Sequence, residues 1–483
     1  MNIITPMKKT LSYGTLAGVL FLACSSAAGA AGKDAGELIF QDDFNGTLAE
    51  GWFFEREERA NWRVGPAGLE VRVQPGNMWG GANNAKNVMV RAIPTPTEAP
   101  VQISVTISNQ PTAQWEQANL VWYYDGGNMV KLGQELVTGR YSIVMGREEG
   151  DRARTVAIIP LDAHTVELRL QAVNNRVRGQ FRTAAWRDWR DVGECDLPVK
   201  GEPKASLHFY NGPPNEEHWV RVNHFTVRRL PAGSADWPRV RLEEKMLRAT
   251  DSPRLESDAV SLPGSFTLLS YVKDVATDPK ADYEQSIYGN HDGSYGWHWD
   301  RRTSASKEPT VVCVGVGTDA LWPVARKDSF LPIAVAALKS LELELDAVTR
   351  LENDRGDHNL VVLMQTKPAG RVAIWFDWYG QTSEVQSLND GYRAYGHVPV
   401  PAGSNEIQYR IKGFRGAPPR VNLKAFLDDA NRRGLAPQSQ VLSVWFGNEI
   451  WNGSRGGTLV TKLDLILDGQ RYSSVPVKPE EKK

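Results

Sequence analysis

The sequence predicts an all-β protein built from two antiparallel β-sandwiches. Short runs that alternate apolar with polar side chains recur along the chain, and glycine, asparagine and proline separate them. Such alternation buries one face of a strand and leaves the other face in water. Residues 231–238, with two prolines and several small residues, interrupt the pattern and predict a linker between two halves.

The first half, residues 37–230, shows the alternation in several short segments. The clearest segments are residues 68–73, 101–107, 165–172 and 220–227. Strands of this length, separated by turns, are typical of an antiparallel sandwich. We therefore expect residues 37–230 to form the first sandwich.

The second half, residues 239–472, repeats the pattern with longer strands. They are expected at residues 341–345, 359–364, 371–378, 406–411, 441–446 and 459–467. One short helix is predicted over residues 422–433, because its apolar side chains fall on one face and Gly434 follows as a C-cap. That face carries Leu423, Phe426 and Leu427. Residues 473–483 are charged and are expected to be a disordered tail.

The N-terminus has the features of an export signal. Lys8 and Lys9 precede an apolar run, residues 16–23, and a stretch of small residues ends at Ala30. The run is shorter than the roughly 20 residues that a membrane-spanning helix needs. We therefore expect residues 1–30 to be a signal peptide and the protein to be exported, to the periplasm or the extracellular space. A surface lipoprotein anchored through Cys24 is the alternative.

Charge and cysteine content exclude several classes of function. Lys and Arg number 56 against 57 Asp and Glu, so the chain has no broad cationic field for nucleic acid. Cys195 and Cys313 lie far apart in sequence, and no zinc motif is present, so we expect neither a disulfide framework nor a metal site or cofactor. The alternative is a structural calcium ion held by Asp42 and Asp43.

Two predicted strands place tryptophan and ionisable side chains on one face. In residues 441–451 and 371–379, every second side chain belongs to this face. It carries Trp445, Glu449 and Trp451 in the first strand, and Arg371, Trp375, Asp377 and Tyr379 in the second. Indole rings stack on sugar rings, and carboxylates bind hydroxyls or protonate a glycosidic oxygen, so the pattern indicates a sugar-binding cleft. The structural alternative is that these rings are core.

The second half resembles glycoside hydrolase family 12 from about residue 283 to residue 467. The strand at residues 441–453 is similar to the family's C-terminal Gly-Thr-Glu-Pro-Phe motif, and the helix before it also matches. Residues 283–290 and 293–299 look like further family segments, as do residues 330–335. The resemblance implies an endo-β-glucanase or xyloglucanase in which Glu449 is the general acid/base. It also implies that Trp297 and Trp299 contact substrate.

Arg371 departs from the family pattern. The best match to the family's nucleophile strand is residues 371–380, and it places Arg371 at the nucleophile. A guanidinium is always cationic and cannot form a glycosyl-enzyme intermediate. Three interpretations stay open: Asp377 replaces the nucleophile, Glu449 serves a different glycan chemistry, or the domain binds glycan without cutting it, with Arg371 clamping a hydroxyl or a uronate. A register slip would instead bring Glu406 to the position.

The first half resembles another sandwich family. Residues 42–46, followed by Trp52, look like the opening strand of concanavalin A-like sandwiches. Residues 118–125, 128–133 and 186–193 are similar to the sandwich appended to family 43 β-xylosidases. This implies an accessory glycan-binding role, with Trp122, Tyr124, Trp186 and Trp189 as platforms, unless these rings are core.

Together, residues and resemblance predict two concanavalin A-like antiparallel β-sandwiches of the jelly-roll type, the second with one short helix. The expected partner is a β-linked polysaccharide or an oligosaccharide. The function is expected to be that of an exported glycoside hydrolase-like protein with Glu449 as general acid/base, and the alternative is a non-catalytic glycan-binding protein.

Overall fold

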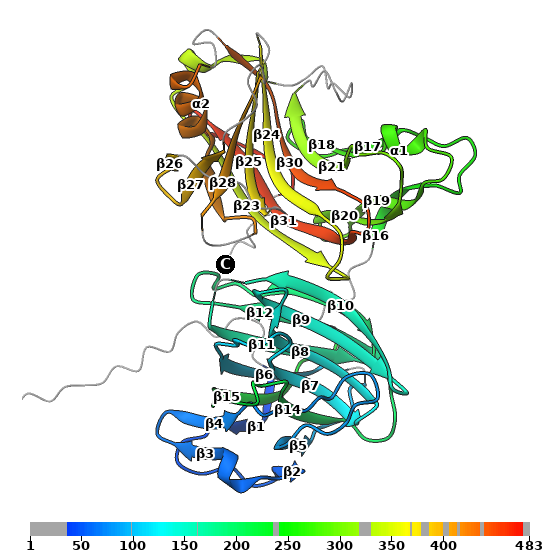
Figure 1. Cartoon of the computed structure of the whole chain (residues 1–483), viewed down its shortest axis with the longest axis vertical. Coiled ribbons are helices and arrows are strands. Elements are labelled where there is room, and N and C mark those ends of the chain that lie inside the picture. Colours follow the sequence, from blue (N-terminus) through cyan, green and yellow to red (C-terminus); the bar gives the residue numbers. More distant parts are fainter. Residues whose placement is uncertain are drawn as a thin grey trace, which may run out of the picture. The chain divides into compact units, whose positions relative to one another are not determined.

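In the computed structural model, the described residues are 36–97, 99–161, 163–234, 241–317, 330–367, 370–377, 386–398, 405–412, 416–434 and 439–476. Strands dominate them, and the predicted all-β fold class is confirmed (Figure 1). No helix of this part of the chain is long and apolar enough to cross a membrane. The predicted signal peptide lies outside the described residues, as do residues 235–240 of the linker region and 477–483 of the tail, so these remain predictions.

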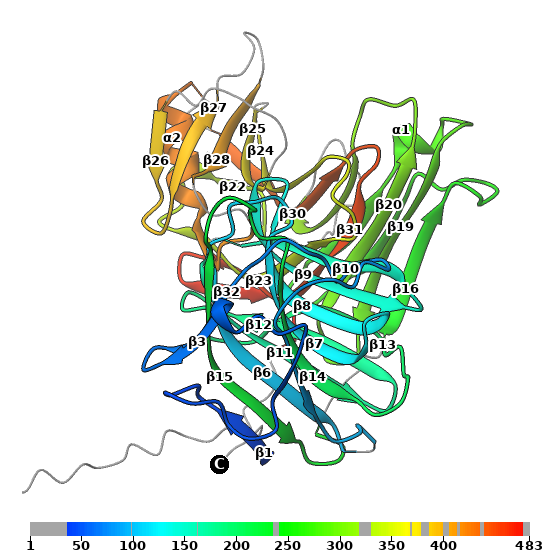
Figure 2. The same cartoon turned by 60° about the horizontal axis from the view of Figure 1, so that its bottom comes forward.

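The N-terminal sandwich consists of two facing layers of strands. One layer has the order β13 (Arg190–Asp196), β12 (Arg176–Arg182), β11 (Thr165–Val173), β6 (Val101–Ser108), β15 (Trp219–Arg229), β4 (Gly68–Arg72) and β3 (Trp62–Gly65). Strand β1 (Glu37–Asp42) pairs with β15 and lies beside it in Figure 2. The other layer has the order β10 (Arg152–Pro160), β9 (Arg140–Glu149), β8 (Asn128–Val137), β7 (Gln117–Asp125), β14 (Lys204–Tyr210), β5 (Val88–Ala92) and β2 (Phe53–Glu55).

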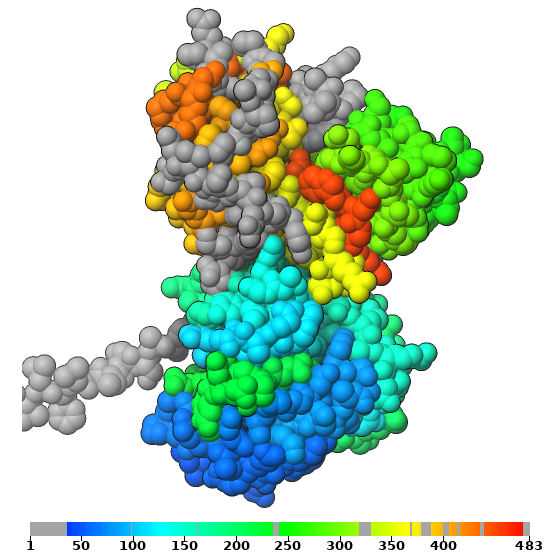
Figure 3. Space-filling model, in the orientation of Figure 1, coloured from blue at the N-terminus to red at the C-terminus, as the bar shows by residue number. Residues whose placement is uncertain are grey.

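The C-terminal sandwich also has two layers. The first has the order β16 (Arg241–Arg248), β19 (Asp282–Asn290), β20 (Tyr295–Thr303), β31 (Arg455–Leu467) and β23 (Leu341–Leu351), with β29 (Arg420–Asn422) on β23 and β32 (Gln470–Ser473) on β31. The pair Ile158–Leu351 continues it into β10. In Figure 3, the red-orange surface of the last strands lies between the yellow and green surfaces of this sandwich.

The second layer of the C-terminal sandwich is the longer one. Its order is β17 (Ser257–Ser261), β18 (Thr267–Tyr271), β21 (Thr310–Gly317), β30 (Gln440–Ile450), β24 (His358–Lys367), β25 (Gly370–Asp377), β28 (Glu406–Ile411), β27 (Ala394–Val398) and β26 (Gln386–Asn389), with β22 (Ile333–Ala334) on β30. Neighbouring strands are antiparallel, except that β25 and β28 run parallel.

Short helical segments complete the described structure. They are α1 (Lys273–Ala276), α2 (Leu423–Arg432) and two 3-10 turns, Arg59–Asn61 and Val335–Ala337. Helix α2 confirms the predicted helix. At its start, the Asn422 side chain accepts a hydrogen bond from the amide of Ala425 and caps the helix. Gly434 follows its end with a positive φ of 112°. Its apolar face is buried in the core of the C-terminal sandwich.

Each sandwich has its own main hydrophobic core. The N-terminal core lies between β11 and β7 and includes Leu168, Leu170 and Trp122. The C-terminal core includes Phe446, Trp297 and Phe426. No buried residue belongs to both cores among the described parts of the chain, so each sandwich buries apolar surface largely by itself.

Candidate functional site

A cavity of about 550 Å³ opens on the face of β21, β30, β24, β25 and β28 that is turned away from the C-terminal core. We call it the cleft. Its aromatic and ionisable lining consists of Tyr271, Trp375, Trp451, Asp274, Glu308, Asp357, Glu406, Glu449, Arg371 and Arg410. Aromatic rings and planar charged groups are thus mixed on one concave surface.

The parallel pair β25 and β28 supplies one wall of the cleft. Arg371 lies opposite Glu406 in the register, and Trp375 lies opposite Arg410. Arg371 Nε is 2.9 Å from Glu406 Oε2, and the Arg410 guanidinium stacks 4.5 Å from the centre of the Trp375 ring. Both side chains of each pair therefore point to the same face and hold one another in place.

Glu449 lies near the end of β30 and is only 7% exposed. Asn359, its register partner on β24, donates a hydrogen bond of 3.2 Å from Nδ2 to Glu449 Oε2. The other oxygen, Oε1, lies 3.5 Å from a terminal nitrogen of Arg371. The carboxyl group is therefore held from two sides.

Burial is the largest influence on the Glu449 carboxyl group. It raises the pKa of Glu449, and the nearby charge of Glu406 acts in the same direction. Arg371 and the hydrogen bond from Asn359 lower this pKa, but they only partly offset the burial. Glu449 therefore keeps a proton to a higher pH than an exposed glutamate does, as a general acid must.

Arg371, near the start of β25, contacts two of the carboxylates that line the cleft, Glu406 and Glu449. Through β24, Arg371 is level with Ser443, which is six residues before Glu449 on β30. The side chains of Arg371 and Glu449 nevertheless contact each other. This face of the sheet must therefore be strongly concave. A guanidinium in this place can donate hydrogen bonds but cannot attack an anomeric carbon.

Trp445 lies on the predicted face, but it is covered. The ring is 1% exposed and packs with Leu269, Leu363 and Ala373 beneath the cleft. The indole fits because its register partner Gly315 has no Cβ; a Cβ at this position would come within 2.8 Å of the ring. The prediction that Trp445 contacts a ligand is therefore wrong for this structure, while Trp375 and Trp451 do line the cleft.

Asp377 points away from the cleft. A β-bulge shifts the register of β25 against β24, so that Val361 pairs with Trp375 and Leu360 pairs with Asp377. The extra residue reverses the alternation, and Asp377 falls on the face of its core partner Leu360. Its carboxylate lies 3.5 Å from Nε2 of the buried His358. Asp377 therefore does not replace the nucleophile.

Trp297 and Trp299 belong to the core, which corrects their predicted contact with substrate. Both are fully buried, and their Nε1 groups donate to Asn448 Oδ1 and Ser454 Oγ at 2.8 and 2.9 Å. Satisfied indoles between two sheets have no face for a sugar. Tyr379 lies outside the described residues.

Two of the predicted platforms of the N-terminal sandwich are not open. Trp122 and Tyr124 are buried in its core, so their predicted contact with a glycan is wrong. Trp186 and Trp189 are half-buried. Arg190 stacks 4.3 Å from the centre of the Trp186 ring, while Arg169 and Arg182 stack 4.3 and 4.6 Å from that of Trp189. The platform role of these two rings stays a prediction.

The expected calcium ligands hold a turn instead. Asp42 accepts hydrogen bonds from the amides of Phe44 and Ala49 and from Nε1 of Trp52. Asp43 pairs with His224 at 2.8 Å. No group of three or more His, Cys, Asp or Glu side chains that could hold a metal occurs in the parts that the structure describes.

The strand at residues 406–411 contributes more to the site than the sequence indicated. Glu406, Gln408 and Arg410 all line the cleft, whereas the sequence pointed to Glu406 alone. Their alternation in Glu-Ile-Gln-Tyr-Arg-Ile is the signal that could have revealed a polar face on this strand. Asn359 and Tyr271 gave no comparable signal.

No protein-family model and no curated protein matches this chain. A family 12 xyloglucanase from Bacillus licheniformis is 15% identical, with a TM-score of 0.39 over 47% of this chain and 99% of that one. An endoglucanase from Rhodothermus marinus is 19% identical, with a TM-score of 0.37 over 47% and 99%. A glycoside hydrolase family 43 protein from Bacillus licheniformis is 17% identical, with a TM-score of 0.35, and only 39% of each chain is covered. These are the families that the sequence resembles, and the similarity concerns the fold alone.

Proposed function

We propose that the cleft binds a segment of a β-linked polysaccharide, of the β-glucan or xyloglucan type that the sequence resemblance implies. Three aromatic side chains, Tyr271, Trp375 and Trp451, line it, and stacking on sugar rings needs such surfaces. Gln408, Arg410 and the carboxylates supply hydrogen-bond partners for hydroxyl groups. A volume of about 550 Å³ lies within the range of ligand sites.

We further propose that the cleft binds its glycan without cleaving it by double displacement. The observation that carries this proposal is the position of Arg371, which contacts both Glu406 and Glu449. A bound guanidinium between two carboxylates supplies hydroxyl contacts and no nucleophile.

Hydrolysis with Glu449 as general acid is the second candidate. The raised pKa of Glu449 favours it, because a proton donor must stay protonated near the working pH. Glu406 lines the same cleft and would have to serve as the base or the nucleophile. In that case Arg371 would have to leave at least one carboxylate when substrate enters.

Titration calorimetry and reducing-sugar release with barley β-glucan, xyloglucan and xylan separate the two candidates. We expect binding without release of reducing ends, and binding about tenfold weaker in Trp451→Ala because a stacking surface is lost. Trp219→Ala is the matched control, since this half-buried ring on β15 lies under Arg63 outside the cleft. Release of reducing ends that Glu449→Gln abolishes would establish hydrolysis, and unchanged binding in Trp451→Ala would refute the cleft.

A further inference from the structure

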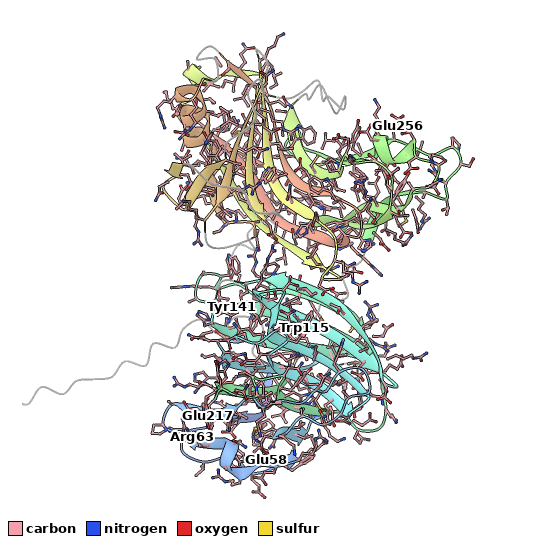
Figure 4. All side chains as sticks on the ribbon, in the orientation of Figure 1. Glu58, Arg63, Trp115, Tyr141, Glu217 and Glu256 are labelled. Atoms are coloured by element: carbon pink, nitrogen blue, oxygen red, sulfur yellow. The ribbon has the colours of Figure 1, made fainter. Side chains whose placement is uncertain are left out.

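A second cavity, of about 390 Å³, lies over the strands β7, β8, β9 and β10 of the N-terminal sandwich. Trp79, Trp115, Gln117, Lys131 and Glu135 line it, together with residues 352–354. Trp115, which precedes β7, is labelled in Figure 4. None of the aromatic residues predicted as platforms from the sequence belongs to this lining.

The floor of this cavity is a buried ion pair, Lys131 and Glu135, whose opposite charges cancel. Lys131 and Glu135 are each 4% exposed, and Lys131 Nζ lies 3.1 Å from Glu135 Oε2. Lys131 Nζ also donates to Gln117 Oε1 at 2.6 Å. An ammonium group has three N–H bonds, and the described acceptors take two of them, so one donor remains for a ligand. The floor thus offers hydrogen bonds without a net charge.

Trp79 forms one fixed wall. Its ring centre lies 4.6 Å from Lys131 Nζ, and the ring covers Gly146, where a Cβ would come within 2.4 Å of it. The following amides of Gly80 and Gly81 donate to the fully buried Glu148 at 3.1 and 3.3 Å. These contacts hold the loop and its indole in one position before any ligand arrives.

Trp115 forms the rim and has a costly backbone conformation. Its φ is +70°, in the left-handed region that bulky residues avoid, and its side chain is 39% exposed. Its amide donates to Leu136 O and its carbonyl accepts from Gln117 Nε2, both at 2.9 Å. A strained residue that holds an exposed indole at a cavity has no evident structural benefit, and such strain is typical of binding sites.

We propose that this cavity is a second saccharide-binding site, which takes an uncharged pyranose segment between Trp79 and Trp115. The two indoles provide stacking surfaces, and Lys131, Gln117 and Glu135 provide donors and acceptors for hydroxyl groups. The Lys131–Glu135 pair cancels its own charge, and Glu352 and Asp354 make the rest of the lining acidic, so an anionic ligand would find no counter-charge here. This cavity and the cleft share no lining residue, so the second site stands or falls independently of the proposed function.

Calorimetric titration with cellohexaose and xylohexaose tests the site in the full chain. In a Trp451→Ala background, which weakens the cleft, we expect residual binding of at least one hexasaccharide. Trp115→Ala should weaken that binding about tenfold or more, and Trp79→Ala similarly, because each removes a stacking surface. Trp219→Ala in the same background should leave it unchanged.

The outcomes separate the two sites. If only the cleft binds, Trp451→Ala weakens all binding, and adding Trp115→Ala or Trp79→Ala leaves the residual binding unchanged, which overturns the second site. If only the second site binds, the wild type shows one site that Trp115→Ala weakens and Trp451→Ala leaves intact. Because Trp115 is exposed, its variant should keep the wild-type circular dichroism and melting curve, which excludes misfolding as the cause.

Discussion

At the scale of single residues, the environment of Glu449 combines burial with two polar partners. The Asn359 amide and the Arg371 guanidinium contact different oxygens of its carboxyl group. Burial still dominates and raises its pKa. A carboxyl group that holds its proton more tightly when folded makes stability depend on pH in a defined direction.

We expect Glu449→Gln to gain stability relative to the wild type as the pH rises. The folded pKa lies above the ordinary value of 4.5, so the contribution of Glu449 is fully present below that value and is lost as the pH rises through the folded pKa. Glutamine has no such loss and keeps an acceptor for Asn359. Urea denaturation at pH 4.5 and 7.5 measures the difference. Glu308→Gln is the matched control, because Glu308 is exposed at the same cleft. A larger gain in stability for Glu449→Gln at pH 4.5 than at pH 7.5 would contradict the prediction.

Strand parity predicted the cleft face only in part. It placed Glu449, Trp451, Arg371 and Trp375 correctly, because a regular strand has period two. It could not show that Trp445 is covered, since that depends on Gly315 in another strand. Short motifs also do not distinguish a core tryptophan from a platform, because both carry the same residue type at the same spacing.

At the scale of elements, helix α2 depends on its first turn. The side chain of Asn422 occupies one of the amides that a helix start leaves without a partner. The buried face of the helix packs against the C-terminal core, including Tyr395 and Tyr409 through Phe426.

Asn422→Ala should lower the free energy of unfolding by about 1 kcal/mol, the usual cost of losing an N-cap. Asp428→Ala is the control in the same helix, because it removes only a partly exposed pair with Lys424 and should cost about 0.5 kcal/mol or less. Chemical denaturation measures both variants. Equal losses in the two would show that the cap does not stabilise the helix specifically.

Elements were easier to predict than their pairing. Alternation identified the strands and 3.6-residue periodicity the helix, because both are local properties of the chain. The parallel pairing of β25 with β28 was not predictable in this way, because it depends on how distant segments meet. That pairing brings Glu406 beside Arg371, so the key contact of the cleft depended on information that is not local.

At the scale of the whole molecule, the two cores allow a direct test of independence. Leu168→Ala removes a fully buried side chain from the N-terminal core, and Leu427→Ala removes one from the C-terminal core. Each should cost about 2–5 kcal/mol in its own sandwich.

In scanning calorimetry we expect two unfolding transitions, with Leu168→Ala lowering one midpoint and Leu427→Ala the other. Separate cores unfold separately unless the contact between them is large and apolar. A single transition that both variants lower equally would mean that the two sandwiches form one cooperative unit.

The bulge in β25 has a consequence for how such a cleft can change during evolution. Because Phe376 is the additional residue, its deletion would leave Asp377 directly after Trp375 and opposite Leu360, so strict alternation would return with the carboxylate still on the core face. The bulge can therefore be gained or lost by a single codon without adding a carboxylate to the cleft. A new acidic group at this place would need a substitution on the face of Arg371 and Trp375.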